Sequence, residues 1–312
     1  MTINDKELES YYKNKNILVT GGSGSIGEYI VAELLKFKPK LILVLNKDDS
    51  KQYLMKQKYG NMKNIQFYLA DIRNYQDVEY ATRDMDYVFH AAALKQVPIC
   101  EDHPIEAVKT NIIGSENVIK ASISNKVKKV VNISTDKAVN PVNTLGMTKR
   151  IAENMFYRAN SMFNNKHTKF CSVRFGNVIG SRGSVISLFR SQIQAKEPLS
   201  LTDPAMTRFF MTIPQAVHLI LNAMYYCKGG ETFILKMKAL KIGDLVKAFK
   251  KYCEETGMNI PSVQTIGMRP GEKMHEELLY DNEQNVVLEG EDFFIVIPTQ
   301  ESKITPTSVQ PK

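Results

Sequence analysis

Short apolar runs alternate with longer amphipathic stretches through the first half of this chain. The runs are rich in β-branched residues and occupy residues 17–20, 41–45, 65–70, 87–93, 129–134 and 170–176. The stretches with helical spacing between them include residues 25–37, 104–124 and 145–163. Strands that are almost continuously apolar are buried on both faces, as in a parallel sheet between two layers of helices. The pattern therefore predicts an α/β fold with a doubly wound parallel sheet.

The alternation weakens after residue 176, where glycine and proline become more frequent. One further helix and one further strand are predicted over residues 213–226 and 232–235. We expect residues 1–176 to form the doubly wound domain, with the strand over 232–235 returning to its sheet. Residues 177–312 are then mainly a smaller C-terminal α/β domain, with a weakly ordered tail from about residue 298.

The composition is that of an ordinary globular protein. Hydrophobic residues make up 43% of the 312 residues, which is enough for a large core and excludes disorder as the main state. No window approaches the roughly 18 apolar residues of a membrane span, and the first residues lack the apolar core of a signal peptide. We therefore expect a cytoplasmic protein without a membrane partner.

A formal net charge of +8 raises the question of nucleic-acid binding. The basic residues are scattered among apolar ones, and no nucleic-acid-binding motif is present. We therefore expect no nucleic-acid partner. A positive field also attracts a small polyanion such as a nucleotide diphosphate.

The cysteines and histidines show no metal-ligand spacing. The four cysteines lie far apart without a CxxC pair, so we interpret them as buried thiols: Cys100, Cys171, Cys227 and Cys253. His90 ends a buried run and is interpreted as a core histidine whose hydrogen bonds are satisfied. We predict no metal site, because the other histidines also lack ligand spacing: His103, His167, His218 and His275.

A glycine-rich loop, TGGSGSIG, directly follows the first predicted strand and opens a helix. Gly21 permits a tight turn, Gly24 lets the backbone approach a pyrophosphate, and Gly27 lets the helix pack against the strand. In this position the triplet predicts a Rossmann-type domain that binds NAD or NADP. The other loop residues expected to contact the cofactor are Ser23, Ser25 and Ile26.

The residues after the second predicted strand bear on the choice between NADP and NAD. An acid at this point would bind the ribose 2′-hydroxyl of NAD, but the strand ends on Asn46 and Lys47. Lys47 could pair with a 2′-phosphate, which slightly favours NADP, whereas Asp48 would favour NAD if it turned inward. Further cofactor contacts are expected after the third and fourth strands and beyond, from Asp71, Ile72, Ala91, Ala92, Ala93 and Asn111.

Polar residues suited to catalysis follow the fifth predicted strand. Thr135, Asp136 and Lys137 come directly after it, and Lys149 lies on the next predicted helix. In an open α/β sheet, ligands bind beyond the carboxyl ends of the strands, which is where this cluster falls.

Seven segments together carry a resemblance to a known family. They are TGGSGSIG (20–27), HAAALKQVP (90–98), TNIIG (110–114), STDKAVNP (134–141), RFGNVIGSRGSV (174–185), DPAMTRFFMT (203–212) and RPGEK (269–273). The chain resembles the extended short-chain dehydrogenases/reductases that act on nucleotide sugars. Among these it is most similar to the UDP-N-acetylglucosamine 4,6-dehydratases of bacterial surface-polysaccharide synthesis, of which the 134–141 segment is typical.

The resemblance implies a reaction in which one tightly bound NADP or NAD is recycled. A hydride leaves carbon 4 of UDP-N-acetylglucosamine, water is lost across carbons 5 and 6, and the hydride returns to carbon 6. Asp136 and Lys137 would supply the acid and the base, provided that Asp136 is protonated and Lys137 neutral at the right moments. Thr135 would hydrogen-bond the 4-oxygen. Lys149 would hold the nicotinamide ribose and lower the pKa of the group that takes the 4-hydroxyl proton.

One position departs from the superfamily pattern Tyr-x-x-x-Lys. Leu145 stands four residues before Lys149, where the tyrosine would act as a base, and leucine cannot carry a proton. A subgroup of these dehydratases has methionine there and is associated with retention of configuration at carbon 5. We therefore predict a retaining dehydratase in which Asp136 or Lys137 takes over the missing role.

The resemblance also places the substrate and suggests self-association. Lys95 and Asn177 match positions near the sugar, and three arginines match positions that hold the diphosphate and uridine: Arg182, Arg208 and Arg269. Glu272 is assigned to the same substrate site, or it braces the loop of Arg269. A homo-oligomer is expected, because relatives associate through helices beside the active-site lysine.

Two other classes of protein stay open. A nucleotide-sugar epimerase or ketoreductase is less favoured, because the missing tyrosine weighs more in a reaction that lacks the Asp136–Lys137 pair. A non-catalytic dinucleotide-binding sensor has no chemical need of Asp136, Lys137 and Lys149. The dehydratase is the hypothesis that uses all of these residues.

Overall fold

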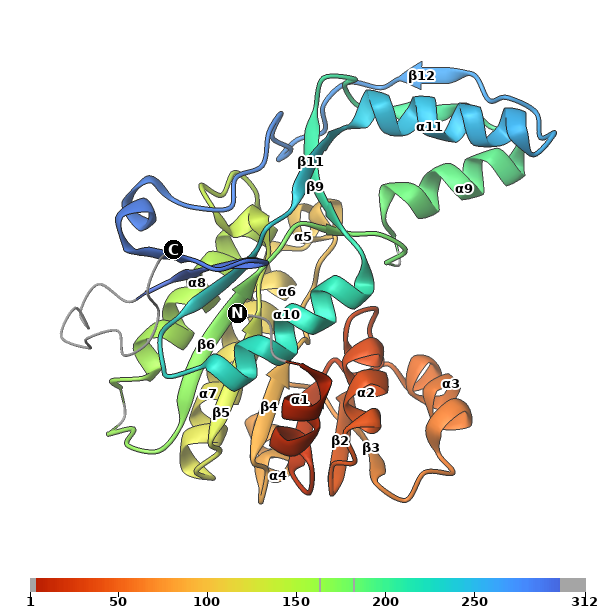
Figure 1. The fold of residues 1–312 in the computed structure, drawn as a ribbon. Helices are drawn as coiled ribbons and strands as arrows, with labels where there is room; N and C mark the ends of the chain where they lie inside the picture. Colours follow the sequence, from red (N-terminus) through yellow and green to blue (C-terminus); the bar gives the residue numbers. More distant parts are fainter. Residues whose placement is uncertain (1–3, 163, 182, 298–312) are drawn as a thin grey trace.

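The computed structural model describes residues 4–162, 164–181 and 183–297. Arg182 and the tail from residue 298 lie outside the described residues. The described chain forms a main sheet of nine strands in the order β13-β14-β10-β6-β5-β4-β1-β2-β3 (Figure 1). Its strands are β1 (Asn16–Thr20), β2 (Leu41–Asn46), β3 (Ile65–Leu69), β4 (Tyr87–His90), β5 (Lys129–Ile133), β6 (Lys169–Arg174), β10 (Thr232–Leu235), β13 (Val287–Glu289) and β14 (Phe293–Val296).

The strand directions identify the type of sheet. Neighbours from β3 to β10 run parallel, whereas β14 is antiparallel to β10 and β13 is antiparallel to β14. The order β3-β2-β1-β4-β5-β6 is that of the doubly wound dinucleotide-binding sheet. The predicted α/β fold class is therefore confirmed. Strands β13 and β14, which the sequence pattern did not predict, extend the sheet beyond β10.

Both faces of the main sheet are buried, because alternate side chains of a strand enter different apolar cores. On β1, Ile17 and Val19 belong to one core and Leu18 to the other. The first core is covered by α1 (Asp5–Tyr12), α2 (Gly27–Lys36), α3 (Asp49–Tyr59) and α10 (Ile213–Tyr226), and the second by α4 (Tyr75–Thr82), α7 (Gly114–Ser124) and α8 (Thr144–Ala159). This double burial explains why the strands are almost continuously apolar.

The helix predicted over 104–124 is interrupted. After α5 (Val97–Asp102), the chain forms α6 (Pro104–Ala107), a π-helical turn η1 (Val108–Ile113) and then α7. A single π turn of six residues is too short to be recognised in a periodicity that is read over the whole segment. Helix α7 also approaches the loop after β3 closely, since a Cβ on Gly114 would lie 2.6 Å from Ile72 Cδ1.

A smaller part of the chain stands beyond the carboxyl ends of the main strands (Figure 1). It contains a three-stranded sheet of β7 (Asn177–Val178), β9 (Thr207–Met211) and β11 (Lys238–Lys241), and a pair of strands, β8 (Leu199–Leu201) and β12 (Val263–Thr265). Helices α9 (Val185–Ala195) and α11 (Ile242–Glu255) enclose its own core, which includes Phe189 and Leu245. These elements form a smaller α/β unit with an apolar core of its own.

His90 lies in a buried chain of hydrogen bonds beneath the glycine loop. Ser115 donates its hydroxyl proton to the Asn111 carbonyl (2.7 Å), so His90 Nε2, 3.1 Å from Ser115 Oγ, must carry a proton and donate it. His90 Nδ1 then accepts from Thr20 Oγ1 at 2.8 Å. This is the satisfied core histidine expected from the sequence. Burial, reinforced by the charge of Lys149, lowers the pKa of His90 from 6.5 to about 3.

Because of His90, the free energy of unfolding is expected to decrease as the pH drops below about 6.5. In the unfolded chain His90 binds a proton near pH 6.5, whereas in the folded protein it stays neutral down to about pH 3. The contribution of neutral His90 to stability is therefore complete above the unfolded pKa and is lost as the pH drops. The expected loss is about 1 kcal/mol per pH unit. Urea unfolding at about pH 7 and about pH 5 measures how much stability each protein loses between the two pH values. His90→Gln should lose less than the wild type. Equal losses in both proteins would contradict this role.

Candidate active site

A cavity of about 820 Å³ lies where the carboxyl ends of the main strands meet the smaller part. Most predicted site residues line it: Gly21, Gly24, Ser25, Ile26, Gly27, Asn46, Lys47, Asp71, Ile72, Ala91, Ala92, Ala93, Lys95, Thr135, Lys137, Lys149, Asn177, Arg208, Arg269 and Glu272. Three others are buried behind the lining: Ser23, Asn111 and Asp136. The structure thus brings the candidate cofactor residues and the candidate catalytic residues to one cavity.

The glycine loop packs so closely against neighbouring backbone that two of its positions have no room for a Cβ atom. Gly21 has φ +65°, and a Cβ there would lie 2.7 Å from Ala92 Cα. A Cβ on Gly27 would lie 2.3 Å from Gly21 O. Helix α2 starts at this loop, and Ile26 at its N-cap offers no side chain to its first amides. The Glu28 amide donates to Gly24 O at 3.1 Å, and the other amides at the start of α2 can bind an anion such as a pyrophosphate.

At the cavity rim after β2 and β3, the acidic side chains are engaged by neighbouring residues, whereas a basic side chain stays accessible. Asp48 caps α3 by accepting from the Lys51 amide at 2.9 Å. Arg73 lies 2.6 Å from Asp71, whereas Lys47 lies 3.8 Å from it and keeps 49% of its side chain exposed. Burial acts to raise the pKa of Asp71, but the hydrogen bonds from Arg73 and the charge of Lys47 lower it overall. Asp71 is therefore an anion here, and Lys47 remains accessible.

Asn111 does not face the cavity. Its Oδ1 accepts from the Leu94 amide at 2.8 Å, and its Nδ2 donates to Leu94 O at 3.1 Å and to Thr148 Oγ1 at 3.0 Å. The side chain therefore fixes the loop after β4, which carries Ala91–Ala93 and Lys95, against helix α8. In this structure Asn111 positions the cavity wall instead of forming it.

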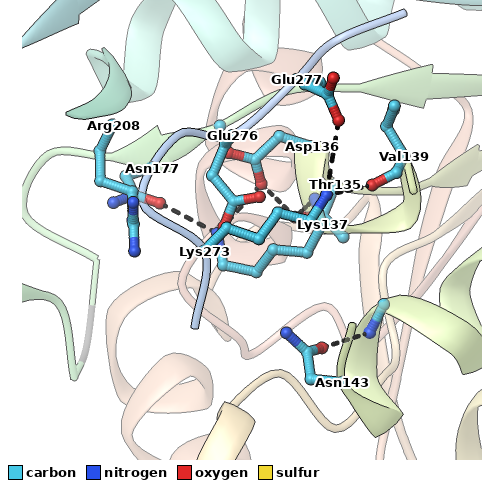
Figure 2. Close-up of polar contacts among 12 residues, drawn as sticks. Thr135, Asp136, Lys137, Val139, Asn143, Asn177, Arg208, Lys273, Glu276 and Glu277 are labelled. Carbon is cyan, nitrogen blue, oxygen red and sulfur yellow. Dashed lines mark hydrogen bonds and ion pairs between the residues drawn. The ribbon is translucent and has the colours of Figure 1, made fainter. Parts of the chain in front are cut away.

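The cluster after β5 begins with a 3-10 turn, η2 (Asp136–Ala138). Thr135 Oγ1 donates to Asp136 Oδ1 at 2.9 Å, and Lys137 Nζ lies 3.1 Å from the same oxygen (Figure 2). Asp136 is completely buried, whereas Thr135 and Lys137 line the cavity. Asp136 can therefore reach a ligand only through these two neighbours.

Glu276 completes this cluster and was missed in the sequence. It lies far along the chain from η2, yet its Oε1 is 3.5 Å from Lys137 Nζ, and it lines the cavity (Figure 2). Burial acts to lower the pKa of Lys137, but Asp136 and Glu276 outweigh it and raise the pKa above its ordinary value. Lys137 is thus an ammonium at rest, not the neutral amine that the sequence-based mechanism requires at one of its steps.

Helix α8 presents Lys149 to the cavity from another side. Lys149 is 6% exposed, and burial lowers its pKa to about 8, although the charge of Glu153 opposes the shift. Leu145, one turn earlier, also lines the cavity and packs with Cys100 and Ala107. No tyrosine is found among the described lining residues. The aliphatic replacement of the usual tyrosine is therefore part of the cavity wall.

A buried ion-pair network joins α8 to the segment that bears Glu276. Arg174, fully buried at the end of β6, donates to Glu153 at 3.2 and 2.8 Å and to Glu283 at 2.8 and 3.1 Å. Glu283 belongs to the 3-10 turn η3 (Asp281–Val286). Arg174 also donates to Leu278 O at 2.7 Å. The network anchors both sides of the catalytic cluster to the main sheet.

The residues expected to bind the substrate differ in burial. Arg208 is 7% exposed and donates to Thr207 O at 2.8 Å, and its positive charge acts on Lys137 in the cluster. Arg269 is exposed on its loop, and Glu272 accepts from its amide at 3.1 Å. Lys273 donates to Val139 O at 2.7 Å. Glu272 and Lys273 therefore brace this loop, and Arg182 lies outside the described residues.

Comparison with known proteins places the chain in a family. A model described as polysaccharide biosynthesis protein matches residues 17–298. The chain belongs to this family. The UDP-N-acetylglucosamine 4,6-dehydratase (inverting) of Campylobacter jejuni serotype O:23/36 is 39% identical over 92% of this chain and 84% of its own. The sequence-based resemblance is therefore confirmed.

Two further relatives widen the comparison. A Rickettsia bellii protein named UDP-glucose 4-epimerase is 43% identical over 87% of this chain and 80% of its own. The X-ray structure of Pen from Bacillus thuringiensis has a TM-score of 0.89 and 45% identity, covering 92% of this chain and 89% of that one. Family members thus carry dehydratase and epimerase names, and the choice depends on the site.

Other features of the described residues add little to the site. All four cysteines are buried and unpaired, as expected. The described histidines, cysteines and acids form no cluster of three suited to a metal ion. None of the described helices is both long and apolar enough to cross a bilayer.

Proposed function

We propose that this protein is a UDP-N-acetylglucosamine 4,6-dehydratase that uses a bound nicotinamide dinucleotide. The observation that carries the proposal is the Thr135–Asp136–Lys137 cluster, extended by Glu276, in the same cavity as the glycine loop and Lys149. Oxidation and reduction at carbon 4 alone, as in an epimerase, would leave the Asp136–Lys137 pair without a task. The elimination of water requires both an acid and a base.

The cavity fits a dinucleotide along one wall. The amides at the start of α2 suit its pyrophosphate, the small side chains of Ala91–Ala93 allow close approach, and Lys149 suits the nicotinamide ribose. When bound, the nicotinamide would accept the hydride from carbon 4 and return it to carbon 6. In this arrangement residues 1–176 and β10 are the cofactor domain, and residues from 177 onward mainly bind the sugar nucleotide.

The 4-hydroxyl proton needs an acceptor other than tyrosine. Thr135 Oγ1 donates its own proton to Asp136 and accepts a long hydrogen bond from the Lys137 amide at 3.5 Å, which leaves one lone pair to accept the proton of the 4-hydroxyl. As the 4-oxygen becomes a ketone, Thr135 Oγ1 takes that proton and passes its own to Asp136 Oδ1. Asp136 thereby takes over the tyrosine role through Thr135. The ammonium of Lys137, protonated at rest, donates a proton to the departing 6-oxygen.

We keep retention at carbon 5 as part of the proposal. Retention follows when the group that removes the carbon-5 proton returns it to the same face, and inversion needs a second acid on the opposite face. The acids that adjoin Lys137, namely Asp136 and Glu276, belong to one cluster. The Campylobacter relatives are named as inverting, so this stereochemistry requires direct measurement.

The deciding experiment is an NMR time course of the purified protein with UDP-N-acetylglucosamine in deuterated water. A new 6-methyl signal, loss of one water and deuterium at carbon 5 are expected, with the gluco configuration retained. A C4-epimerised sugar would establish the epimerase instead. Unchanged sugar after addition of NAD and of NADP would overturn the dehydratase proposal.

Replacing Lys47 with alanine is expected to weaken NADP about tenfold more than NAD. Lys47 stands at the rim with an accessible ammonium, while Asp48 is engaged as a helix cap, so a 2′-phosphate would find a cation there. Titration of cofactor-free protein with each dinucleotide measures the difference. Lys56→Ala, on the exposed side of α3, is the control. Equal weakening of both dinucleotides would contradict the NADP preference.

Leu145→Tyr is expected to reduce turnover by about tenfold or more. A phenol would overpack the site where Leu145 contacts Cys100 and Ala107, both fully buried. Leu145→Met, which nearly preserves volume, should keep most of the activity. Turnover and melting temperature of the two variants give the comparison. Higher activity in Leu145→Tyr would mean that the cavity is still built for a phenolic base.

A further inference from the structure

Removal of the carbon-5 proton requires a base, and Lys137 is already protonated at rest. The carboxylates among the described lining residues are those of Asp48, Asp71, Glu272 and Glu276. The first two lie at the rim after β2 and β3, and the third accepts a hydrogen bond from its own loop. Glu276 is therefore the carboxylate of the described lining that stands beside Lys137.

Asp136 is excluded from direct contact with the sugar by its burial. It is 0% exposed, does not line the cavity, and directs Oδ1 to Thr135 and Lys137. A Cβ on Gly176 would lie 3.2 Å from Asp136 Oδ2, so the backbone closes the other side. A carbon-bound proton can be removed only by a group that reaches it, and this condition favours Glu276 over Asp136.

The carboxylate of Glu276 is desolvated and incompletely used. Its side chain is 3% exposed, Oε1 lies 3.5 Å from Lys137 Nζ, and Oε2 has no hydrogen-bond partner among the described residues. A buried polar atom without a partner is costly unless a ligand supplies one. Rotation about the last side-chain bond exchanges the two oxygens, so either can face the cavity.

The position of Glu276 is determined by its neighbours on the chain. Thr207 of β9 donates its amide to Met274 O at 2.9 Å and forms a β-bridge with His275. Arg174 holds Leu278 O on the other side. The segment that bears Glu276 is therefore tied to β9 and to the end of β6, and the carboxylate is preorganised beside Lys137 before substrate binds.

We propose that Glu276 is the base that removes the proton from carbon 5, an inference that rests on the proposed dehydratase function. The C5–H bond breaks and its proton goes to a carboxylate oxygen of Glu276. The electron pair forms the C5–C6 double bond as the C6–O bond breaks, and the leaving oxygen takes a proton from Lys137 and departs as water. After hydride returns to carbon 6, Glu276, whose proton has exchanged with solvent, protonates the same face of carbon 5. The proton that Asp136 took from the 4-hydroxyl passes to Lys137, 3.1 Å away, and restores the ammonium.

The charges around the pair suit this exchange. Lys137 faces Asp136 from η2 and Glu276 from the opposite segment, and Arg208 of β9 adds a positive charge that acts to lower the pKa of Lys137. The adjacent Glu277 and Lys273 interact with each other at 3.7 Å and lie outside this pair. The base and the acid are thus held together as a carboxylate and an ammonium.

The test uses Glu276→Gln, with the adjacent Glu277→Gln as the matched control. Glu277 is 51% exposed and accepts from Asn140 at 2.9 Å, so its amide variant should leave activity unchanged. Each protein is loaded with its dinucleotide and mixed with UDP-N-acetylglucosamine in deuterated water. For Glu276→Gln we expect product formation to fall by about 10²–10⁴-fold, reduced nicotinamide to accumulate, and deuterium at carbon 5 to be absent.

Several outcomes separate this inference from the proposed function. If the wild-type protein gives no 6-deoxy-4-keto product, the dehydratase proposal fails, and the Glu276 inference fails with it. If the wild type is active and Glu276→Gln still exchanges deuterium at carbon 5 at the wild-type rate, only the inference about Glu276 fails. If Glu276→Gln does not fold, as judged by its melting curve, Glu276→Asp replaces it. That variant keeps a carboxylate and should exchange more slowly, whereas an undiminished rate would overturn the inference.

Discussion

Lys137→Ala is expected to lower turnover of UDP-N-acetylglucosamine by about 10³-fold while the bound dinucleotide is retained. Lys137 carries the proton that the departing 6-oxygen needs, and the carboxylates of Asp136 and Glu276 keep it charged. Its Nζ lies in a cluster distinct from the glycine loop, so cofactor content should not change. Stopped-flow kinetics and the nicotinamide absorbance of the purified variant measure both quantities.

Lys137→Arg distinguishes proton donation from mere charge. A guanidinium keeps the positive charge beside Asp136 and Glu276 but does not release a proton near neutral pH. We expect this variant to stop at the same step as Lys137→Ala. Substantial turnover in Lys137→Arg would show that Lys137 acts only through its charge, and full turnover in Lys137→Ala would remove it from the mechanism.

Arg174→Met is expected to reduce the free energy of unfolding by about 3–5 kcal/mol. The substitution removes the cation that the buried carboxylates of Glu153 and Glu283 share, and it leaves Glu153 with only the more distant Arg150, at 3.6 Å. Removing one partner of a buried ion pair is strongly destabilising. Urea unfolding measures the loss. Arg158→Met, at the exposed end of α8, is the control and should change stability by less than about 0.5 kcal/mol.

A loss no larger than that of the control would mean that the network relaxes or fills with water. Arg174→Lys adds a finer comparison, because lysine keeps the charge but loses the paired geometry of the guanidinium. Its stability should fall between those of wild type and Arg174→Met. The same order is expected for the activity, since Arg174 also holds Leu278 O near Glu276.

The sequence predicted the parts of the fold that depend on local patterning. Strands β1 to β6 were visible because each is a short, mostly apolar run, which all but the edge strand β3 bury on both faces. The glycine loop was visible because its backbone tolerates no Cβ. Strands β13 and β14 were not predicted. Phe293–Val296 is a continuous apolar run, but β13 and β14 are short, pair antiparallel and lie outside the alternation of strands and helices on which the prediction rested.

The candidate site was predicted where its residues adjoin a strand end. Thr135, Asp136 and Lys137 follow β5 directly, so topology alone placed them at the cavity. Glu276 comes from a loop that no local pattern links to β5, and only its pairing with β9 brings it to Lys137. The direction of the Lys137 pKa shift could not be predicted from the sequence either, because it depends on the carboxylate of Glu276 as well as that of Asp136.

The late position of the segment that bears Glu276 has a consequence for biosynthesis. Residues up to the end of β6 include the glycine loop, η2 and Lys149, and they can begin to fold as soon as they leave the ribosome. Glu276 is added only when its segment docks on β9 and Arg174 binds Glu283, close to the last described strands. A nascent chain therefore acquires the parts of its dinucleotide site well before its elimination chemistry. A chain that ends before this segment therefore has the glycine loop and η2 but lacks the carboxylate that we propose as the base.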